Sequence, residues 1–170
     1  MTDKNKKVFD ALQKAMRAEM EGHYFYSMAA GACEDPKAKE TFRALAEEER
    51  MHMEFLRRQY DSILETGKVD PKANMGVKTD LSDESPIFSS AIRSRIGDAH
   101  YEMTALAVAI QLERDAETFY RKMANESEDP ELAGFYAELA DWEAEHYRAF
   151  LAQQEGLKED YWSEAGFAPF

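Results

Sequence analysis

Apolar residues recur at intervals of three and four along four stretches of the chain, which is the spacing of one face of an α-helix. The first two stretches are residues 12–30 and 42–60, and the last two are residues 106–123 and 132–150. Each stretch is long enough for about five helical turns. The pattern therefore predicts four long amphipathic helices.

Capping residues indicate where these helices begin and end. An Asp-Pro pair precedes the second and the fourth stretch, at residues 35–36 and 129–130. Asp is a favoured N-cap residue, and proline is favoured at the first helical position. Gly67 follows the second stretch and Gly156 follows the fourth, so we expect these helices to end there. The short links within each pair of helices make each pair antiparallel.

The two pairs of helices are related by an internal repeat with an offset of 94 residues. Residues 15–57 laid on residues 109–151 share 12 identities in 43 positions, where ordinary composition gives about two or three. We infer a duplicated helical hairpin. The identical positions include Glu19/Glu113, Asp35/Asp129, Pro36/Pro130, Glu49/Glu143 and His52/His146.

A long polar connection, residues 66–98, joins the two hairpins and contains several glycines and prolines. It is too interrupted for a long helix, but the Ser-Pro pair at residues 85–86 can begin a short one. We expect that short helix to bury Ile87, Phe88 and Ile92. A link of this length between antiparallel hairpins has to cross the bundle.

The sequence therefore predicts a single all-α domain, an antiparallel four-helix bundle made of two duplicated helical hairpins with one long crossover. The tail is aromatic and contains Gly166 and Pro169. We expect it to pack on a surface or a partner rather than to form a fifth long helix. The predicted parts of the domain 1–170 are the first hairpin at 1–65, the crossover at 66–98, the second hairpin at 99–156 and the tail at 157–170.

The charge of the chain is strongly acidic. Its 170 residues include 34 acidic and 21 basic ones, giving a formal net charge of −13. We therefore expect neither a nucleic-acid nor a membrane partner, because both need clustered cations. No apolar run approaches the ~20 residues of a membrane span, and the N-terminus lacks the features of a signal peptide. We expect a cytoplasmic protein.

Six polar residues interrupt the apolar stripes, and they carry the candidate chemistry. The first and third stripes each hold a glutamate, whereas the second and fourth each hold a Glu-x-x-His motif, whose two side chains share a helix face. Four buried carboxylates without partners would cost several kcal/mol each, and two divalent cations would balance their charge. The six residues are Glu19, Glu49, His52, Glu113, Glu143 and His146. They fit the ligand pattern of ferritin-like two-metal carboxylate proteins.

The motifs AMRAEMEGHYFYSMAA, LAEEERMHMEFL, AIQLERDAETFYRKMA and LADWEAEHYRAFL together resemble those of the rubrerythrin-type, ferritin-like di-iron proteins. The resemblance covers residues 5–155. It implies a ferritin-like bundle that holds two iron ions, with manganese or zinc as alternatives. It also implies carboxylate ligands at Glu19, Glu49, Glu113 and Glu143, of which Glu49 and Glu143 are the bridges, and nitrogen ligands at His52 and His146.

The chain departs from this family in two respects. Cys33 is its single cysteine, so the paired CxxC motifs of a rubredoxin-like iron site are absent. Many rubrerythrins also have a further ligand glutamate at the position of Ala116. Of its neighbours, only Glu117 shares the helix face of Glu113. This departure favours a symmetric six-ligand pattern, as in bacterioferritins, over the usual peroxidase site.

Two tyrosines and several other polar residues admit more than one interpretation. Tyr26 and Tyr120 follow their glutamates by seven residues, so each is either a core residue or a donor to a ligand carboxylate or redox relay. His23 is expected on the helix surface or beside a ligand, and whether His23 or Glu117 joins the site stays open. Side chains expected on the solvated surface are Glu47, Glu48 and Glu54, and Trp142 is expected in the core.

The resemblance implies a peroxidase-like oxidoreductase that protects against oxidative stress. It would reduce hydrogen peroxide or dioxygen with electrons from an external donor such as rubredoxin or a flavoprotein. The alternative is a ferroxidase, iron-storage or metal-buffering protein, and a third possibility is a structural protein that kept a zinc pair. We expect a homodimer.

Overall fold

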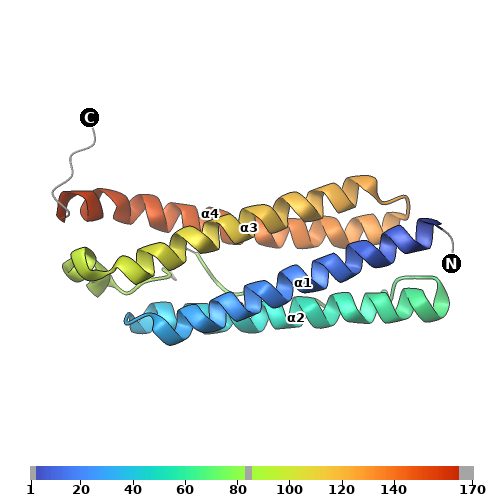
Figure 1. Cartoon of the computed structure of the whole chain (residues 1–170), viewed down its shortest axis with the longest axis horizontal. Coiled ribbons are helices and arrows are strands. Elements are labelled where there is room, and N and C mark those ends of the chain that lie inside the picture. Colours follow the sequence, from blue (N-terminus) through green and yellow to red (C-terminus); the bar gives the residue numbers. More distant parts are fainter. Residues whose placement is uncertain (1–2, 83–85, 165–170) are drawn as a thin grey trace.

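The computed structural model describes residues 3–82 and 86–164, and within these ranges it contains helices and no strand (Figure 1). The four long helices are α1 (Asp3–Ala32), α2 (Pro36–Thr66), α3 (His100–Glu126) and α4 (Pro130–Glu164). A short 3₁₀ helix, η1 (Ser90–Asp98), precedes α3. The predicted all-α bundle is therefore confirmed.

The predicted helix boundaries at the Asp-Pro pairs and at Gly67 are confirmed. Asp35 caps α2, because its side chain accepts a hydrogen bond of 2.9 Å from the Ala38 backbone N–H. Asp129 caps α4 by accepting from the backbone N–H groups of Glu131 and Leu132. Gly67 ends α2 with φ of 75°, a left-handed conformation that glycine adopts without steric cost.

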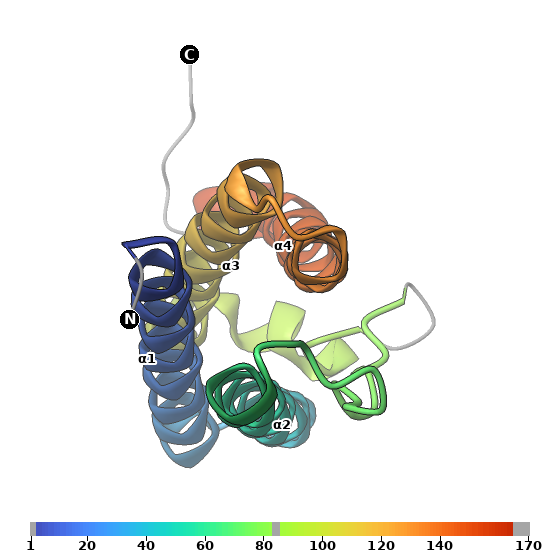
Figure 2. The same cartoon turned by 90° about the vertical axis from the view of Figure 1, so that its right-hand side faces the viewer.

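Each hairpin packs along its whole length, whereas α1 and α3 meet over a short stretch only. Seen along the bundle, the four helices surround one interior, and the crossover runs beside α2 and α4 (Figure 2). It is bonded to both helices. The Thr41 hydroxyl group of α2 donates to the carbonyl oxygen of Ile87, and the N–H of Ile87 donates to the Gln153 side chain of α4. The described part of the crossover therefore lies along the α2–α4 face of the bundle.

The short helix of the crossover begins at Ser90 rather than at the predicted residues 85–86, of which Ser85 lies outside the described residues. The reason is a tertiary contact. The N–H and hydroxyl groups of Ser89 both donate to the Asp35 carboxylate, at 3.0 and 2.5 Å, and hold this segment extended. The predicted burial of Ile87, Phe88 and Ile92 is confirmed.

The fourth helix does not end near Gly156, as predicted, but continues to Glu164. A glycine inside a helix costs only about 1 kcal/mol relative to alanine, and packing on η1 offsets this cost. Leu157 is buried, and the Arg93 side chain donates to the carbonyl oxygen of Gly156 at 3.1 Å. Residues 157–164 of the predicted tail are therefore helical, whereas residues 165–170 lie outside the described part.

The buried apolar residues form two clusters, and the six candidate ligands lie between them. One cluster includes Tyr26, Phe42 and Phe150, and the other includes Leu12 and Tyr136. Along each long helix, the candidate ligands separate residues of the first cluster from residues of the second. The core therefore consists of a polar layer between two apolar ones.

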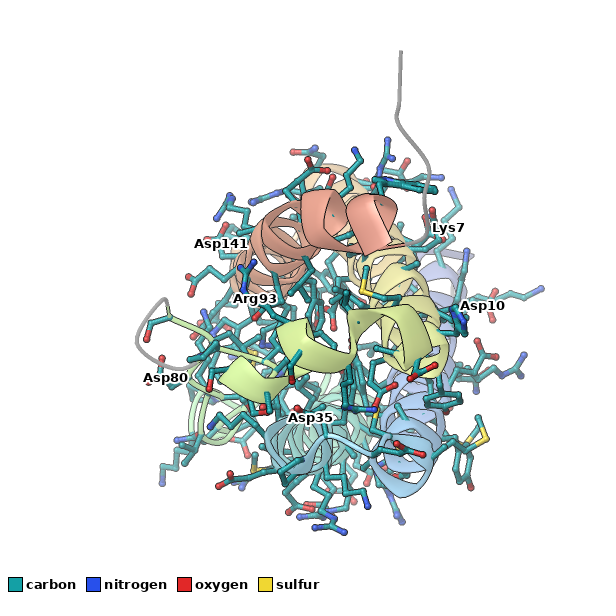
Figure 3. The ribbon with its side chains drawn as sticks, turned by 90° about the vertical axis from the view of Figure 1, so that its left-hand side faces the viewer. Lys7, Asp10, Asp35, Asp80, Arg93 and Asp141 are labelled. Carbon is teal, nitrogen blue, oxygen red and sulfur yellow. The ribbon has the colours of Figure 1, made fainter. Side chains whose placement is uncertain are left out.

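Charged side chains lie around the outside of the bundle, as shown for Asp10 and Asp141 in the end-on view of Figure 3. Within the described ranges, the helices lack a segment that is both long enough and apolar enough to cross a membrane.

Candidate metal centre

All six residues singled out by the stripe pattern meet in the polar layer. Each side chain belongs to a residue that is at most 5% exposed, because helical spacing of three and four turns it away from solvent. The two hairpins contribute equally, as the repeat requires. The residues brought together are Glu19, Glu49, His52, Glu113, Glu143 and His146.

The cluster divides into two groups of four residues that share Glu49 and Glu143. Within each group, one ligand atom from every member lies within 4.8 Å of all the others. Glu19 and His52 complete the first group, and Glu113 and His146 complete the second. This is the geometry of two adjacent metal positions with two shared carboxylates.

Both imidazole rings turn the Nδ1 atom toward the carboxylates. His52 Nδ1 lies 3.3 Å from Glu19 Oε2 and 3.7 Å from oxygens of both Glu49 and Glu143. His146 Nδ1 lies 3.4 Å from Glu113 Oε2 and 3.8 Å from Glu143 Oε2. The Nδ1 atoms are therefore the candidate metal donors, and the Nε2 atoms face away from the cluster.

The surroundings of the four carboxyl groups shift their pKa values in two directions. Burial, followed by the charge of Glu19, raises the pKa of Glu49 well above its ordinary value, and burial with the charge of Glu113 does the same for Glu143. Burial also acts to raise the pKa of Glu19 and of Glu113. Hydrogen bonds and the nearby imidazoles outweigh it and hold both pKa values below normal.

The two histidines are pushed toward their charged forms. Burial lowers the pKa of an imidazole, but the neighbouring Glu19 outweighs burial and raises the pKa of His52. Glu113 acts in the same way on His146, whose pKa is raised well above normal. In the metal-free cluster, protons thus balance the charge that divalent cations would otherwise balance.

Several buried atoms of this cluster lack a hydrogen-bond partner among the described residues. They include Glu113 Oε2, Glu143 Oε1 and His146 Nδ1. An unsatisfied buried oxygen or nitrogen is costly, and a cation bound between these atoms would satisfy them. Carboxylate oxygens and imidazole nitrogens suit iron, manganese and zinc. The residues present therefore fit a pair of divalent metals.

Each tyrosine bonds a glutamate of the other hairpin. The Tyr26 hydroxyl group donates to Glu113, and the Tyr120 hydroxyl group donates to Glu19. Burial and the nearby carboxylates raise the pKa of both phenols well above normal, so both stay protonated and act as donors. Each ring therefore packs in the core and each hydroxyl group contacts a candidate ligand, whereas a role as a redox relay stays a prediction.

The placement of Glu48 on the surface is wrong. Glu48 is completely buried, with Oε1 3.1 Å from His146 Nε2 and Oε2 accepting from the Thr79 backbone N–H at 2.7 Å. A signal for this existed, because Glu48 follows Leu45 by three residues and precedes His52 by four, on the buried stripe. The run of three glutamates concealed it. Glu47 and Glu54 are exposed, as predicted, and both pair with Arg50.

Trp142, the repeat partner of Glu48, is only partly buried, although we expected it in the core. Its ring packs edge-on against the His52 ring, with centroids 5.0 Å apart. The Lys78 ammonium group lies over the Trp142 ring, 5.3 Å from the centroid. Trp142 therefore lies between a candidate ligand and a surface cation.

His23 and Glu117 do not join the cluster. His23 Nδ1 lies 2.7 Å from the carbonyl oxygen of Ala46, and Glu117 pairs with Arg121 at 3.6 Å. Neither belongs to a group of residues whose ligand atoms converge.

A cavity of about 290 Å³ between α1 and α3 reaches the four candidate carboxylates. Small residues at equivalent repeat positions, Gly22 and Ala116, line it together with Tyr26. A Cβ atom at Gly22 would lie 3.3 Å from Glu49 Cδ, so the absence of a side chain there keeps space in front of that carboxylate. This cavity is the candidate entrance to the cluster.

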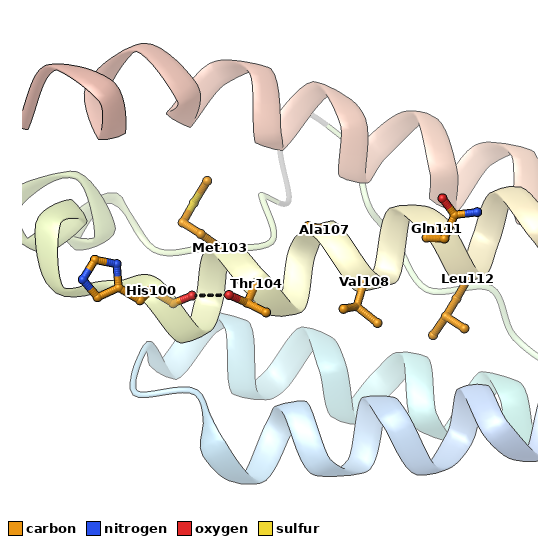
Figure 4. A pocket seen from close by; sticks show the side chains of 7 residues that line it. All are labelled: His100, Met103, Thr104, Ala107, Val108, Gln111 and Leu112. Atoms are coloured by element: carbon orange, nitrogen blue, oxygen red, sulfur yellow. Dashed lines mark hydrogen bonds between the residues drawn. The ribbon is translucent and has the colours of Figure 1, made fainter. Parts of the chain in front are cut away.

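Two other hollows are not centred on the cluster. A shallow one of about 700 Å³ follows the first half of α3 from His100 to Leu112 and contains no carboxylate (Figure 4). Another, of about 600 Å³, lies between the crossover and α4 and touches His146. Neither is lined by the carboxylates on which metal chemistry would depend.

The sequence matches the model of a known protein family. The family model described as Rubrerythrin matches residues 10–152 and, in a second match, residues 104–165. No curated protein and no solved structure matches the sequence. The first matched range includes every residue of the cluster.

Proposed function

Because the chain belongs to the rubrerythrin family, we propose that it is a non-haem di-iron oxidoreductase that reduces hydrogen peroxide or dioxygen with electrons from an external donor. The observation that carries the proposal is the pair of four-residue groups that share Glu49 and Glu143. Two shared carboxylates could hold two metal ions. When bound, a reduced iron pair supplies the two electrons that convert one hydrogen peroxide and two protons into two waters.

Each residue of the cluster has a distinct place in this proposal. Glu49 and Glu143 would bridge the two metals, since both belong to both groups. Glu19 and His52 would complete one metal position, and Glu113 and His146 the other. Four carboxylates carry a charge of −4, which two divalent cations balance. Manganese or zinc would fit the same ligands, but zinc lacks the redox chemistry.

The two tyrosines would orient Glu19 and Glu113, the two carboxylates that each belong to a single metal position. Their hydroxyl groups occupy one oxygen of Glu113 and one of Glu19, and the other oxygen of each faces the Nδ1 atom of a candidate histidine ligand. Partners of this kind fix ligand orientation and contribute to metal affinity. Tyr26 also lines the cavity, where its O–H group lies close to an incoming oxidant.

The cavity between α1 and α3 gives the oxidant its route. Hydrogen peroxide and dioxygen are small compared with about 290 Å³, and the small residues Gly22 and Ala116 leave the carboxylates accessible from it. The described part of the crossover lies along the α2–α4 side. The oxidant would therefore reach the carboxylates from the α1–α3 side, through this cavity.

A ferroxidase or metal-buffering function is the second candidate, and one observation favours it. Glu21 and Asp115, at equivalent repeat positions, both line the cavity and would attract ferrous ions toward the cluster. Lys14 lies on the same cavity but places its ammonium group over the Phe119 ring. Two acids and one base give this entrance a net negative charge.

The electron donor in this proposal is a separate redox centre, such as rubredoxin or a flavoprotein. The 170 residues contain one cysteine, Cys33, which is buried. A rubredoxin-like iron site needs four thiolates. A homodimer, a cytoplasmic location and the absence of nucleic-acid and membrane partners stay predictions. Sedimentation velocity of the purified protein would test the first of these.

Single-turnover kinetics test the proposed function. The protein is loaded anaerobically with two ferrous ions per chain and mixed with hydrogen peroxide or with dioxygen in separate experiments. Faster oxidation by peroxide, without growth of a mineral, supports a peroxide reductase. Faster oxidation by dioxygen, followed by uptake of many further irons per chain, would instead assign the ferroxidase or storage function.

A further inference from the structure

The cluster obeys the internal repeat at every candidate ligand. Glu19 and Glu113, Glu49 and Glu143, and His52 and His146 are each separated by 94 residues, as are the two tyrosines. If the surroundings of the ligands followed the same symmetry, the two metal positions would have equal affinity. The residues that contact the outer side of the two imidazoles show whether the surroundings follow this symmetry.

The repeat fails at one pair in direct contact with the histidines. Residue 48 is a glutamate, and residue 142 is a tryptophan. Glu48 faces His146 from the opposite hairpin, and Trp142 faces His52 in the corresponding place. The outer sides of the two imidazoles are therefore chemically different.

His146 has a fixed carboxylate behind it. Glu48 Oε1 lies 3.1 Å from His146 Nε2, and its other oxygen accepts from the Thr79 N–H of the crossover at 2.7 Å. Both side chains are about 1% exposed, so water does not compete for this contact. The contact lacks full hydrogen-bond geometry in the metal-free structure, because neither Glu48 Oε1 nor His146 Nε2 has a hydrogen-bond partner among the described residues. A carboxylate this close to Nε2 still favours the proton on that nitrogen, which leaves Nδ1 as the lone-pair donor and makes the ring a stronger ligand.

His52 has no such partner. Its Nε2 atom is buried and, like that of His146, has no hydrogen-bond partner among the described residues, but here the ring meets the edge of Trp142 rather than a carboxylate. The Lys78 ammonium group lies over Trp142 and pairs with Glu145, so an aromatic ring rather than a buried carboxylate contacts the outer side of this imidazole. Among the described residues, no carboxylate beside Nε2 favours the tautomer that a metal at Nδ1 requires.

We propose that Glu48 is a positioning residue that makes the two metal positions unequal, so that the position containing His146 binds a divalent metal more tightly than the position containing His52. This inference rests on the two-metal site proposed above. Loss of a carboxylate behind a ligand histidine typically lowers metal affinity about 10–100-fold. The two dissociation constants of the native protein should differ by a factor in this range, and the His146 position should fill first.

Titration of the metal-free protein with Co²⁺, followed by its visible absorption, tests this inference without any turnover. The variants His52→Ala and His146→Ala each retain one imidazole, and so assign each binding step to a position. We expect His52→Ala to bind its first Co²⁺ about 10–100-fold more tightly than His146→Ala does. Equal affinities, or tighter binding by His146→Ala, would overturn the inference.

Adding Glu48→Gln to each single-histidine variant separates positioning from a general structural effect. The amide keeps the shape of Glu48 but removes its charge. Affinity should fall about 10–100-fold in the His52→Ala background and stay unchanged in the His146→Ala background. An equal loss in both backgrounds would overturn the inference. Glu47→Gln, which alters an exposed carboxylate on the same helix turn, is the matched control and should change neither affinity.

The mirror substitution keeps the proposal testable if Glu48→Gln does not fold. Trp142→Glu places a carboxylate behind His52, so the two affinities of the otherwise native chain should approach each other. A gap that stays the same in folded Trp142→Glu would contradict the inference. Absence of any Co²⁺ binding by the native chain is a different outcome, because it would refute the two-metal site itself.

Discussion

The Tyr26 hydroxyl group on α1 donates a hydrogen bond to Glu113 on α3, and so ties the first hairpin to a candidate metal ligand of the second. Tyr120 returns the contact by donating to Glu19. Because α1 and α3 otherwise meet over a short stretch, these two crossed hydrogen bonds hold together the helices that border the cavity.

The tyrosine contacts predict a stability effect. Tyr26→Phe removes a buried donor to a charged carboxylate, which we expect to lower the free energy of unfolding by about 1–3 kcal/mol. Metal affinity should fall as well, because Glu113 loses its orienting partner. Tyr24→Phe is the matched control, since Tyr24 is 59% exposed and its hydroxyl group is not part of the cluster. Urea unfolding with both variants would check this, and equal stability of the two would contradict it.

The shared carboxylates predict the metal stoichiometry. The protein should bind about two divalent ions per chain. Replacing both Glu49 and Glu143 with alanine should abolish binding, because each belongs to both metal positions. Elemental analysis after dialysis measures this directly. The double variant Glu47→Ala, Glu54→Ala, which changes two exposed positions of α2, should keep both ions. Two ions retained by the Glu49, Glu143 variant would refute the site.

The perturbed pKa values predict opposite pH dependences with and without metal. The raised pKa values of Glu49, Glu143, His52 and His146 mean that the folded metal-free protein binds more protons than the unfolded chain. Their contribution to stability is present at low pH and is lost as pH rises through the unfolded and then the folded pKa values. The lowered pKa values of the remaining two glutamates act oppositely, but only as pH falls below about 4.5.

Melting curves at about pH 5 and about pH 7.5 would test this sign. We expect the metal-free protein to be less stable at the higher pH. Metal binding requires the protons to leave, so the increase in melting temperature on adding Mn²⁺ or Zn²⁺ should be larger at the higher pH. An equal increase at both pH values would show that the metal does not displace these protons.

The size of Ala116 predicts control of access. Ala116→Leu would fill part of the cavity in front of the carboxylates, and should slow oxidation of the di-ferrous protein by peroxide at least several-fold while both irons stay bound. Ala107→Leu changes an exposed position of the same helix outside this cavity, and should leave the rate unchanged. Stopped-flow absorbance gives both rates. An unaffected rate in the Ala116 variant would place the entrance elsewhere.

Local pattern was enough to identify most of the fold. The three- and four-residue stripes determined four helices, because burial of one helix face depends on spacing along the chain. Asp35 and Gly67 marked helix ends, because capping is chemistry between near neighbours. The 94-residue repeat distinguished Glu49 and Glu143 from the other glutamates of these helices. The convergence of the six polar residues followed from their common place on the buried faces.

Tertiary structure alone decided what lies behind those six residues. The partner of His146 is Glu48 on another helix, and Glu48 is held by Thr79 in the crossover, so three segments far apart in sequence make one contact. Likewise, Ser89 donates to Asp35, and the short helix begins only after it, at Ser90. Arg93 donates to the carbonyl oxygen of Gly156, at the position where α4 continues beyond its predicted end. Helical periodicity specifies which face of a helix is buried. It does not specify which side chain of another segment meets that face, because that depends on how the hairpins and the crossover pack in space.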